Sequence, residues 1–474
     1  MNRAFRLPPR LTLMAGAAVL LLSGCRIPVQ ERPSSTLEVP ASWRAPLQVG
    51  SNAAVEQAWW RAFGDPVLDS LVAQALAHNG DLRTARARLQ EYQARIRVAR
   101  SASAPSVSVS AGPTRARAIG PLGTPVESTA ITGNVQAAYE FDPWGRLASA
   151  TEAARFDYAA QQAAADAVAL SVAASTASGY LNLRGLDAQL ALARQTLQSR
   201  EQSLALARRQ FEVGYSSRLE LSQAEAEYRN TAAVVPQLER AITQQENALN
   251  LLVGASPGPV ARGAELTALR PPGIAPGLPS ELLRRRPDIA QAERTIAAAD
   301  ASLAAARDQM LPSLRLTASV GGYAHNLPDL LGSGTMLWSV GGSVLAPIFD
   351  AGRLRAQAEI SASLRDRAVF AYESVVRNAF AETENGLSAV QRLREQLEQA
   401  EARRVATAEV LRIAHNRYRN GYSSYLEELD AQRNAFSAET SVLQLRASWL
   451  AAHVDLYRAL GGGWSRVGSI SPGD

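Results

Sequence analysis

Two carboxylates late in the chain have a spacing that could act on ions. Glu427 and Asp430 lie three residues apart, so a helix would carry both on one face. Rings of such side chains around a pore favour cations and repel anions. Glu427 has a second interpretation, because Ser424 completes the Ser-x-x-Glu pattern of a capping box. Asp430 lies one turn beyond that cap, and capping does not explain it.

The other reactive residue types argue against catalysis. The four histidines are scattered without ligand spacing, and the chain has no lysine for a Schiff base or a phosphate loop. A single cysteine allows no intrachain disulfide. The formal charge of +5 falls to +2 (5 − 3) without the three arginines of the N-terminal segment, which is too little for a nucleic-acid partner. We expect no enzyme, no metal site and no cofactor other than a covalent lipid.

The first 25 residues predict export and lipidation. Three arginines precede an apolar run at 11–22, which is shorter than the roughly 20 residues that span a bilayer. Leu22-Ser23-Gly24-Cys25 then resembles a bacterial lipobox, which predicts a signal peptide at 1–24 and a lipid such as palmitate on Cys25. The alternative is an ordinary signal peptide with an incidental cysteine. Arg26, in place of an inner-membrane retention aspartate, favours the outer membrane.

The chain repeats itself at a constant offset. Asp81 matches Asp288, and Gly214 matches Gly421, both 207 residues later (288 − 81 and 421 − 214). Two long copies are too few for a solenoid and suggest two equivalent parts of one symmetric wall. The expected organisation is a lipidated tether at 25–64, a first repeat at 65–254, a linker at 255–287, a second repeat at 288–461 and a tail at 462–474.

Long helices dominate each repeat. The stretch from Gly145 to Gly214 has no proline and would form a helix about 100 Å long. Its apolar seam recurs every seven residues, at Leu190, Leu197, Leu204 and Phe211. Glycines at 214 and 421 are expected to end the long helices, and capping boxes at 217–220 and 424–427 to start the return helices.

Alternating segments predict two strand pairs. Residues 106–111 and 131–141 alternate strictly, and turn formers at 112–123 predict a loop between them. A second pair is expected at 313–322 and 337–347. The hairpins with their turns occupy 103–141 and 312–347.

The strand faces predict a membrane β-barrel. One face of the first pair is apolar, with Val107, Val109, Val135 and Ala137, whereas the opposite face carries Ser108 and Gln136. A soluble hairpin with one buried face is the alternative, but no second sheet or short helix is left to cover the apolar face. Four strands cannot close a barrel, for which about eight is the minimum. Two chains would supply eight strands and three would supply twelve, and a wide lumen favours three.

Three segments resemble the lipoprotein efflux branch of the TolC-like outer membrane factors. They are Ala58-Trp59-Trp60-Arg61-Ala62-Phe63-Gly64-Asp65-Pro66, Phe141-Asp142-Pro143-Trp144-Gly145-Arg146, and Gly277-Leu278-Pro279-Ser280-Glu281-Leu282-Leu283-Arg284-Arg285-Arg286-Pro287-Asp288-Ile289. The resemblance implies a homotrimer whose twelve-stranded β-barrel in the outer membrane continues into a twelve-helix periplasmic α-barrel. It also implies an exit duct for small toxic compounds or drugs, served by a periplasmic adaptor and an inner-membrane pump of the resistance–nodulation–division (RND) type. The arginine run at 284–286 is expected to be a solvated anchor before Asp288.

The resemblance also assigns site residues. It places Tyr418, Glu427 and Asp430 at a periplasmic aperture, although Ser423 stands where the family's best-known member has a turn arginine. The tips of the helical hairpins, which would contact the adaptor, are Gly214, Tyr215, Gly421 and Tyr422. A periplasmic adaptor lipoprotein and a type I secretion channel are the alternative functions.

Overall fold

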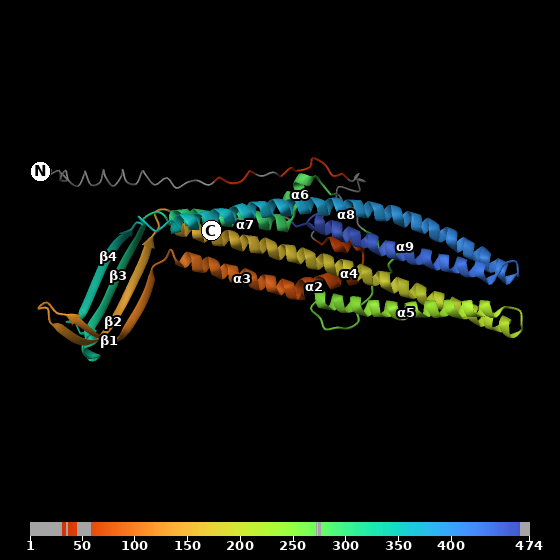
Figure 1. Ribbon diagram of the computed structural model, residues 1–474, viewed down its shortest axis with the longest axis horizontal. Coiled ribbons are helices and arrows are strands. Elements are labelled where there is room, and N and C mark those ends of the chain that lie inside the picture. Colours follow the sequence, from red (N-terminus) through yellow and green to blue (C-terminus); the bar gives the residue numbers. More distant parts are fainter. Residues whose placement is uncertain are drawn as a thin grey trace. The chain divides into compact units, whose positions relative to one another are not determined.

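The computed structural model describes residues 31–34, 37–44, 58–271, 273, 276–332 and 334–464. Its helices are η1 (Trp59–Phe63), α2 (Pro66–His78), α3 (Gly80–Ser101), α4 (Arg146–Glu212), α5 (Arg218–Leu252), α6 (Pro279–Arg285), α7 (Pro287–Asp308), η2 (Pro328–Leu331), α8 (Arg353–Arg419) and α9 (Tyr425–Ala459). Its strands are β1 (Ser106–Ile119), β2 (Pro125–Phe141), β3 (Ser313–Ala324) and β4 (Met336–Leu345) (Figure 1). The chain divides into two compact units, one with the sheet and one with most of the helical packing.

The helices confirm the repeat. Adding 207 to the bounds of α3, α4 and α5 gives the bounds of α7, α8 and α9 without any shift. The predicted long helices are correct, because α4 and α8 each run for 67 residues, about 100 Å at 1.5 Å per residue. Ala193 and Ala207 are buried along α4, each three residues after a leucine of the predicted seam and therefore on the same helix face. In the described part of the chain, no helix has the length and apolar character needed to cross a membrane.

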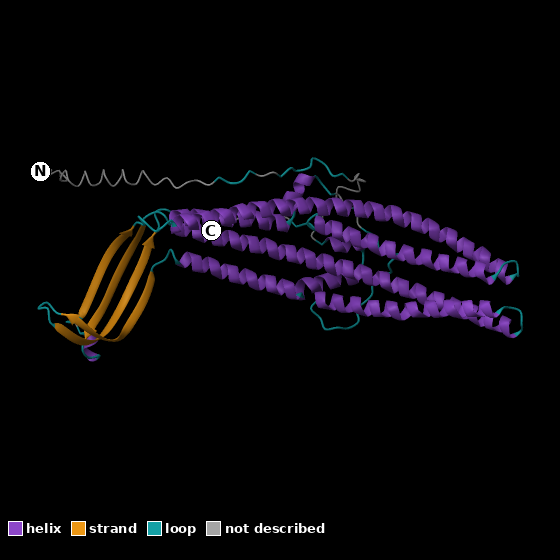
Figure 2. Cartoon of the chain, viewed as in Figure 1, coloured by secondary structure: helices purple, strands orange, loops and turns teal. Residues whose placement is uncertain are grey.

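The first unit contains one antiparallel sheet, drawn in orange in Figure 2, and the order of its strands is β1-β2-β3-β4. The first strand pair is longer than predicted. The expected loop at 112–123 was wrong over residues 112–119, which belong to β1; Gly112, for example, pairs with Thr132 and Pro113 with Ile131 in the β1–β2 ladder. Within the described chain β1 has a partner strand on one side only, which is a position where sheets accept proline.

The second unit holds the main core, to which both repeats contribute. Tyr180 of α4, Leu249 of α5 and Leu450 of α9 are fully buried in one cluster. Trp59 of η1 stacks on Tyr457 of α9, with ring centroids 5.2 Å apart. The Ala58–Pro66 segment therefore contributes an aromatic anchor to this core.

The repeats use equivalent contacts at the start of α3 and of α7. Asn79 Nδ2 donates to the Leu252 carbonyl at 2.9 Å, and Arg286 Nη1 donates to the Ala459 carbonyl at 2.9 Å. Both pairs are related by 207 residues (286 − 79 and 459 − 252). Arg286 is buried and also pairs with Asp288 at 2.6 Å. The prediction of a solvated arginine run holds for Arg284, which is exposed, and was wrong for Arg286.

Part of the expected tether packs against the second repeat. Trp43 is buried beside Phe380 and Leu456, and its Nε1 donates to the Gly277 carbonyl at 2.8 Å. Upstream, Arg365 Nη2 donates to the Glu31 carbonyl at 2.8 Å. These contacts fix the chain before the first repeat begins.

Candidate functional site

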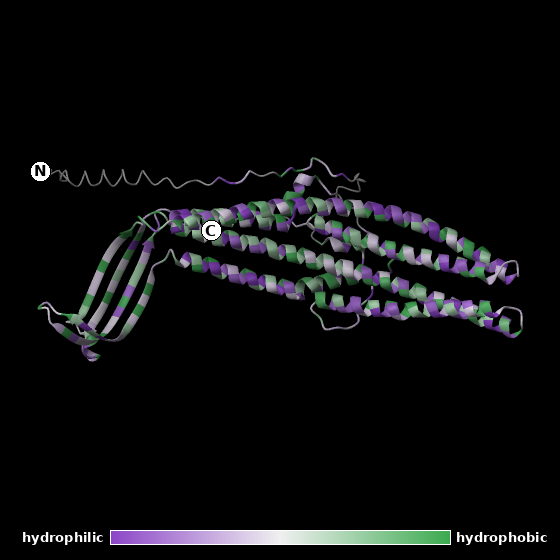
Figure 3. Cartoon of the chain, in the orientation of Figure 1, coloured by the Kyte–Doolittle hydropathy of each residue, from purple (hydrophilic) through white to green (hydrophobic). Residues whose placement is uncertain are grey.

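The strand register sorts the sheet into apolar and polar rows. Residues that pair across neighbouring strands lie on the same face. Two adjacent apolar rows cross all four strands, one made of Val107, Ala137, Ala318 and Val340 and the other of Val109, Val135, Val320 and Trp338. The row between them, on the opposite face, is Ser108, Gln136, Ser319 and Ser339. Hydrophobic and polar residues accordingly alternate along the strands in Figure 3.

In the single chain, side chains of the apolar rows are exposed. Val109 is 75 % exposed and Trp338 is 76 % exposed. Burying such side chains is favourable by about 25 cal/mol per Å², so these rows form a surface for an apolar environment. Strands β1 and β4 are the two edges of the sheet in the described chain, and their backbone groups can pair with another copy.

The helical hairpins end in two nearly identical turns. Gly214 and Gly421 have positive φ values of 77° and 74°. Tyr215 N donates to the Gln210 carbonyl at 2.8 Å, and Tyr422 N donates to the Arg417 carbonyl at 2.9 Å, as in a Schellman motif. The apolar side chains that the turns leave strongly exposed are Val213, Tyr215, Leu219, Tyr422 and Leu426.

In the first of the two predicted capping boxes, the serine side chain forms the expected hydrogen bond. Ser217 Oγ accepts a hydrogen bond from Glu220 N at 3.3 Å. The second prediction was wrong in detail, because the Ser424 side chain makes no capping bond and its carbonyl accepts from Glu427 N instead. The Glu427 carboxylate pairs with Arg417 at 3.3 Å.

Tyr418 joins the second hairpin to the first. Its hydroxyl donates to Gln210 Oε1 of α4 at 3.1 Å, and its ring lies 5.6 Å from the ring of Tyr425. Burial, followed by the negative charges of Glu220 and Glu428, raises the pKa of Tyr418 to about 12. Tyr418 is therefore a neutral hydrogen-bond donor at physiological pH.

Asp430 is exposed near the start of α9. It accepts a hydrogen bond at 3.0 Å from Asn434 Nδ2, which is a neutral group. Glu427, by contrast, has a cationic partner in Arg417. Asp430 thus carries the less compensated charge of the predicted pair.

A cluster of buried charges lies close to these residues, and the sequence patterns did not predict it. Glu227 of α5 is buried between Arg200 of α4 and Arg433 of α9. Nearby, the buried Glu428 carboxylate lies 2.8 Å from His415 Nδ1. The sequence does contain a sign of this cluster. Positions 186, 193, 200 and 207 of α4 follow one another at seven-residue intervals, and all are apolar except position 200, which is arginine.

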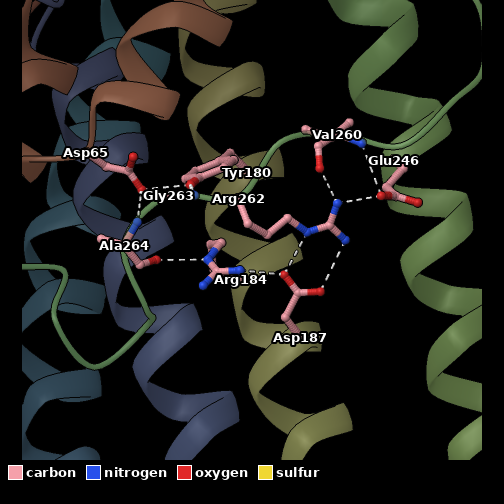
Figure 4. A network of polar contacts seen from close by, with 9 residues as sticks. All are labelled: Asp65, Tyr180, Arg184, Asp187, Glu246, Val260, Arg262, Gly263 and Ala264. Carbon is pink, nitrogen blue, oxygen red and sulfur yellow. Dashed lines mark hydrogen bonds and ion pairs between the residues drawn. The ribbon is translucent and has the colours of Figure 1, made fainter.

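A second polar network fixes part of the segment between the repeats (Figure 4). Asp65 is buried and accepts from Tyr180 Oη at 2.7 Å and from Ala264 N at 3.0 Å. Arg262 Nε contacts Asp187 of α4 at 3.0 Å. Burial and the hydrogen bond with Asp65 raise the pKa of Tyr180. This network connects the start of α2 and the middle of α4 to the segment between the repeats.

Cys25, the expected lipidation site, lies outside the described residues. The other predicted site residues are all described, and they fall into the two turns and the adjoining ends of α8 and α9.

Comparison with known proteins identifies the family. The model of the outer membrane efflux protein family matches residues 71–255 and 278–462, two segments that are again 207 residues apart (278 − 71). The toluene efflux pump outer membrane protein TtgC of Pseudomonas putida is 36% identical over 464 residues, covering 95% of each chain. Outer membrane protein OprJ of Pseudomonas aeruginosa is 34% identical, covering 98% of each chain.

A solved structure agrees with this match. The open state of the Neisseria gonorrhoeae MtrE outer membrane channel has a TM-score of 0.83 and 32% identity, and covers 93% of this chain and 99% of its own. Fold, repeat and sequence therefore lead to one conclusion. The chain belongs to the outer membrane efflux protein family.

Proposed function

We propose that three copies of this protein form the outer-membrane exit duct of a tripartite RND-type efflux system that exports drugs or other small toxic compounds. The observation that carries the proposal is the exposed sheet. Its apolar rows cross all four strands, and its two edge strands can pair with further copies. Pairing β4 of one copy with β1 of the next would give twelve strands (3 × 4) and leave no free edge.

The polar rows would then line the lumen and the apolar rows would face lipid. Such an alternation is what a transmembrane barrel requires. The duct would be passive, and its cargo would be set by the inner-membrane pump. TtgC belongs to a toluene pump, and a small apolar toxic compound is accordingly a suitable first cargo to test.

The hairpin turns would be the periplasmic end of the duct. Tyr215 and Tyr422, with Gly214 and Gly421, would contact a periplasmic adaptor, because they present exposed aromatic surface on two equivalent turns. Asp430, with Glu427 and Tyr418, would line the aperture that these turns surround. Lipid on Cys25 would add an anchor in the outer membrane.

Reconstitution tests the proposal. The full-length protein, extracted in detergent and inserted into planar bilayers, should give stepwise conductance, and native mass spectrometry should give the mass of three chains. Crosslinking in cells should capture an adaptor through the hairpin turns. No conductance, together with the mass of a single chain, would overturn the proposal.

A further inference from the structure

Two arginines continue the apolar face of the sheet beyond its last apolar row. Arg115 and Arg117 follow Val109 on β1 after six and eight residues (115 − 109 and 117 − 109). Even steps along a strand keep side chains on one face, so both arginines lie on the face that carries the apolar rows. Their side chains are 75 % and 68 % exposed. A charged pair thus extends a surface that is otherwise apolar.

The neighbouring strand shows where the apolar surface ends. On β2 this face carries only apolar, aromatic or glycine residues at Ile131, Gly133, Val135, Ala137, Tyr139 and Phe141. Ten residue steps (141 − 131) span about 33 Å along a strand, or about 25 Å across a membrane at the usual tilt of a barrel strand, which is the height of a barrel's apolar band. Arg115 pairs with Thr129, the next position after Ile131 on this face. The arginines therefore begin where the apolar band ends.

This end of the sheet is the one that does not lead into the long helices. Phe141, at the other end of β2, is followed closely by α4, whereas Arg117 lies two residues before the end of β1 and the turn to β2. In the proposed duct the helices extend into the periplasm. The arginines then lie at the outer surface of the membrane, at the level of the phosphorylated sugar headgroups of lipopolysaccharide.

The internal repeat does not require these charges. The positions 207 residues after Arg115 and Arg117 are Gly322 and Ala324, both in β3. The equivalent strand of the second repeat therefore forms without them. Packing within the chain does not explain them either, because both side chains are exposed.

One carboxylate accompanies the two arginines. Glu127 lies 3.1 Å from Arg115 and 3.9 Å from Arg117, and its side chain is 53 % exposed. The group keeps a net charge of +1 (2 − 1), and exposed ion pairs of this kind are weak. Asp329, in the loop of the second hairpin, belongs to η2, which packs over Gly322 of β3, two strands from β1. The two guanidinium groups can therefore accept a further anion.

We propose that Arg115 and Arg117 form a binding site for the phosphate groups of lipid A, the membrane anchor of lipopolysaccharide, on the outer face of the sheet. A guanidinium group donates two parallel hydrogen bonds to phosphate oxygens, while its aliphatic stem lies along the apolar surface. Glu127 competes with the phosphate for both arginines and so limits the affinity. The proposal rests on the proposed function, which places the apolar rows in the outer membrane.

The test counts lipid A molecules bound to the detergent-extracted full-length protein by native mass spectrometry. The double variant Arg115→Gln/Arg117→Gln should bind diphosphorylated lipid A about tenfold more weakly than the parent, because it loses two sets of charge-assisted hydrogen bonds. Arg315→Gln is the matched control. Arg315 is exposed on β3 and pairs with Glu140 on the polar face of the same sheet, so this variant should bind lipid A as the parent does.

Glu127→Gln should act in the opposite direction. Loss of the competing carboxylate leaves both arginines to the phosphate, and lipid A should bind about threefold more tightly, which is the scale of an exposed ion pair. A gain in binding cannot result from a failure to fold. Lipid A from which both phosphates have been removed should bind equally to the parent and to the double variant.

Equal binding of diphosphorylated lipid A to the parent and the double variant would overturn the site. An equal loss in Arg315→Gln would also overturn it, because the effect would then not depend on the outer face. These outcomes differ from a failure of the proposed function. A parent with the mass of one chain and no conductance would contradict the channel, while the lipid counts would still decide whether Arg115 and Arg117 bind phosphate.

Discussion

Asp430 is the residue on which ion selectivity should depend most. Threefold symmetry would repeat it around the aperture, and its partner Asn434 leaves the negative charge uncompensated. Asp430→Ala should therefore reduce cation selectivity, measured as a smaller reversal potential in a salt gradient, and should raise conductance. Glu427→Ala should have a smaller effect, because Arg417 already offsets that charge. Gln223, at the equivalent position of the first repeat, provides the control: Gln223→Ala should match the parent, and identical traces from all variants would place the constriction elsewhere.

Tyr418 should make the contact between hairpins sensitive to strongly alkaline pH only. Its pKa is raised to about 12, above the usual value near 10, so the neutral form is favoured by folding. The resulting stabilisation is complete below pH 10 and is lost as pH rises through about 12. The phenolate difference spectrum between the parent and Tyr418→Phe should therefore titrate near pH 12. A midpoint near 10 would mean that the side chain is not packed as the structure has it.

The side-chain partners of single residues were the feature that sequence patterns predicted least well. Ser424 and Glu427 have the spacing of a capping box, yet Glu427 contacts Arg417 on the neighbouring helix. A glutamate at this position can reach either partner, and local spacing cannot choose between them. Arg286 was expected in solvent as part of the arginine run before Asp288, whereas two of its partners, Glu382 and Ala459, lie far away in sequence.

At the scale of elements, the two faces of the sheet should respond differently to charge. Val109→Arg puts a guanidinium in an apolar row and should lower the free energy of unfolding by about 2–4 kcal/mol if it lies near the bilayer midplane. Ser108→Arg, on the polar face of the same strand, should be tolerated. Urea unfolding of the protein in lipid vesicles measures both. Equal destabilisation of the two variants would remove the basis for assigning the apolar rows to lipid.

The elements themselves were largely predictable, and the repeat explains why. A 67-residue helix with one seam gives many consistent signals, and the second copy gives them again at the same positions. The end of β1 was harder to predict from the sequence, because residues such as Gly112 and Pro113 usually mark turns. They are accepted in β1 since one side of an edge strand needs no partner within the chain. Whether a strand lies at the edge of a sheet depends on the tertiary fold, and local sequence patterns do not reveal it.

At the scale of the whole molecule, each repeat also makes contacts with a segment that lies outside it. Trp43, upstream of both repeats, packs on Phe380 and Leu456 of the second. Asp65 and Tyr180 of the first repeat bind backbone in the segment that follows it. Equivalent helices thus occupy different surroundings, and the repeat alone predicts the helices but not the polar networks that hold them.

The N-terminal segment leads to a last prediction, that lipid on Cys25 is an added anchor and not the sole attachment. Glu31, six residues later, is held by Arg365, so the lipid would lie within about 20 Å of that point. Cys25→Ser should abolish incorporation of a labelled fatty acid, yet the protein should stay in the outer-membrane fraction, because the apolar rows of the sheet would still face lipid. Persistent labelling would show that the lipobox interpretation is wrong. Loss of label together with release into the periplasm would show that the sheet does not hold the protein in the membrane by itself.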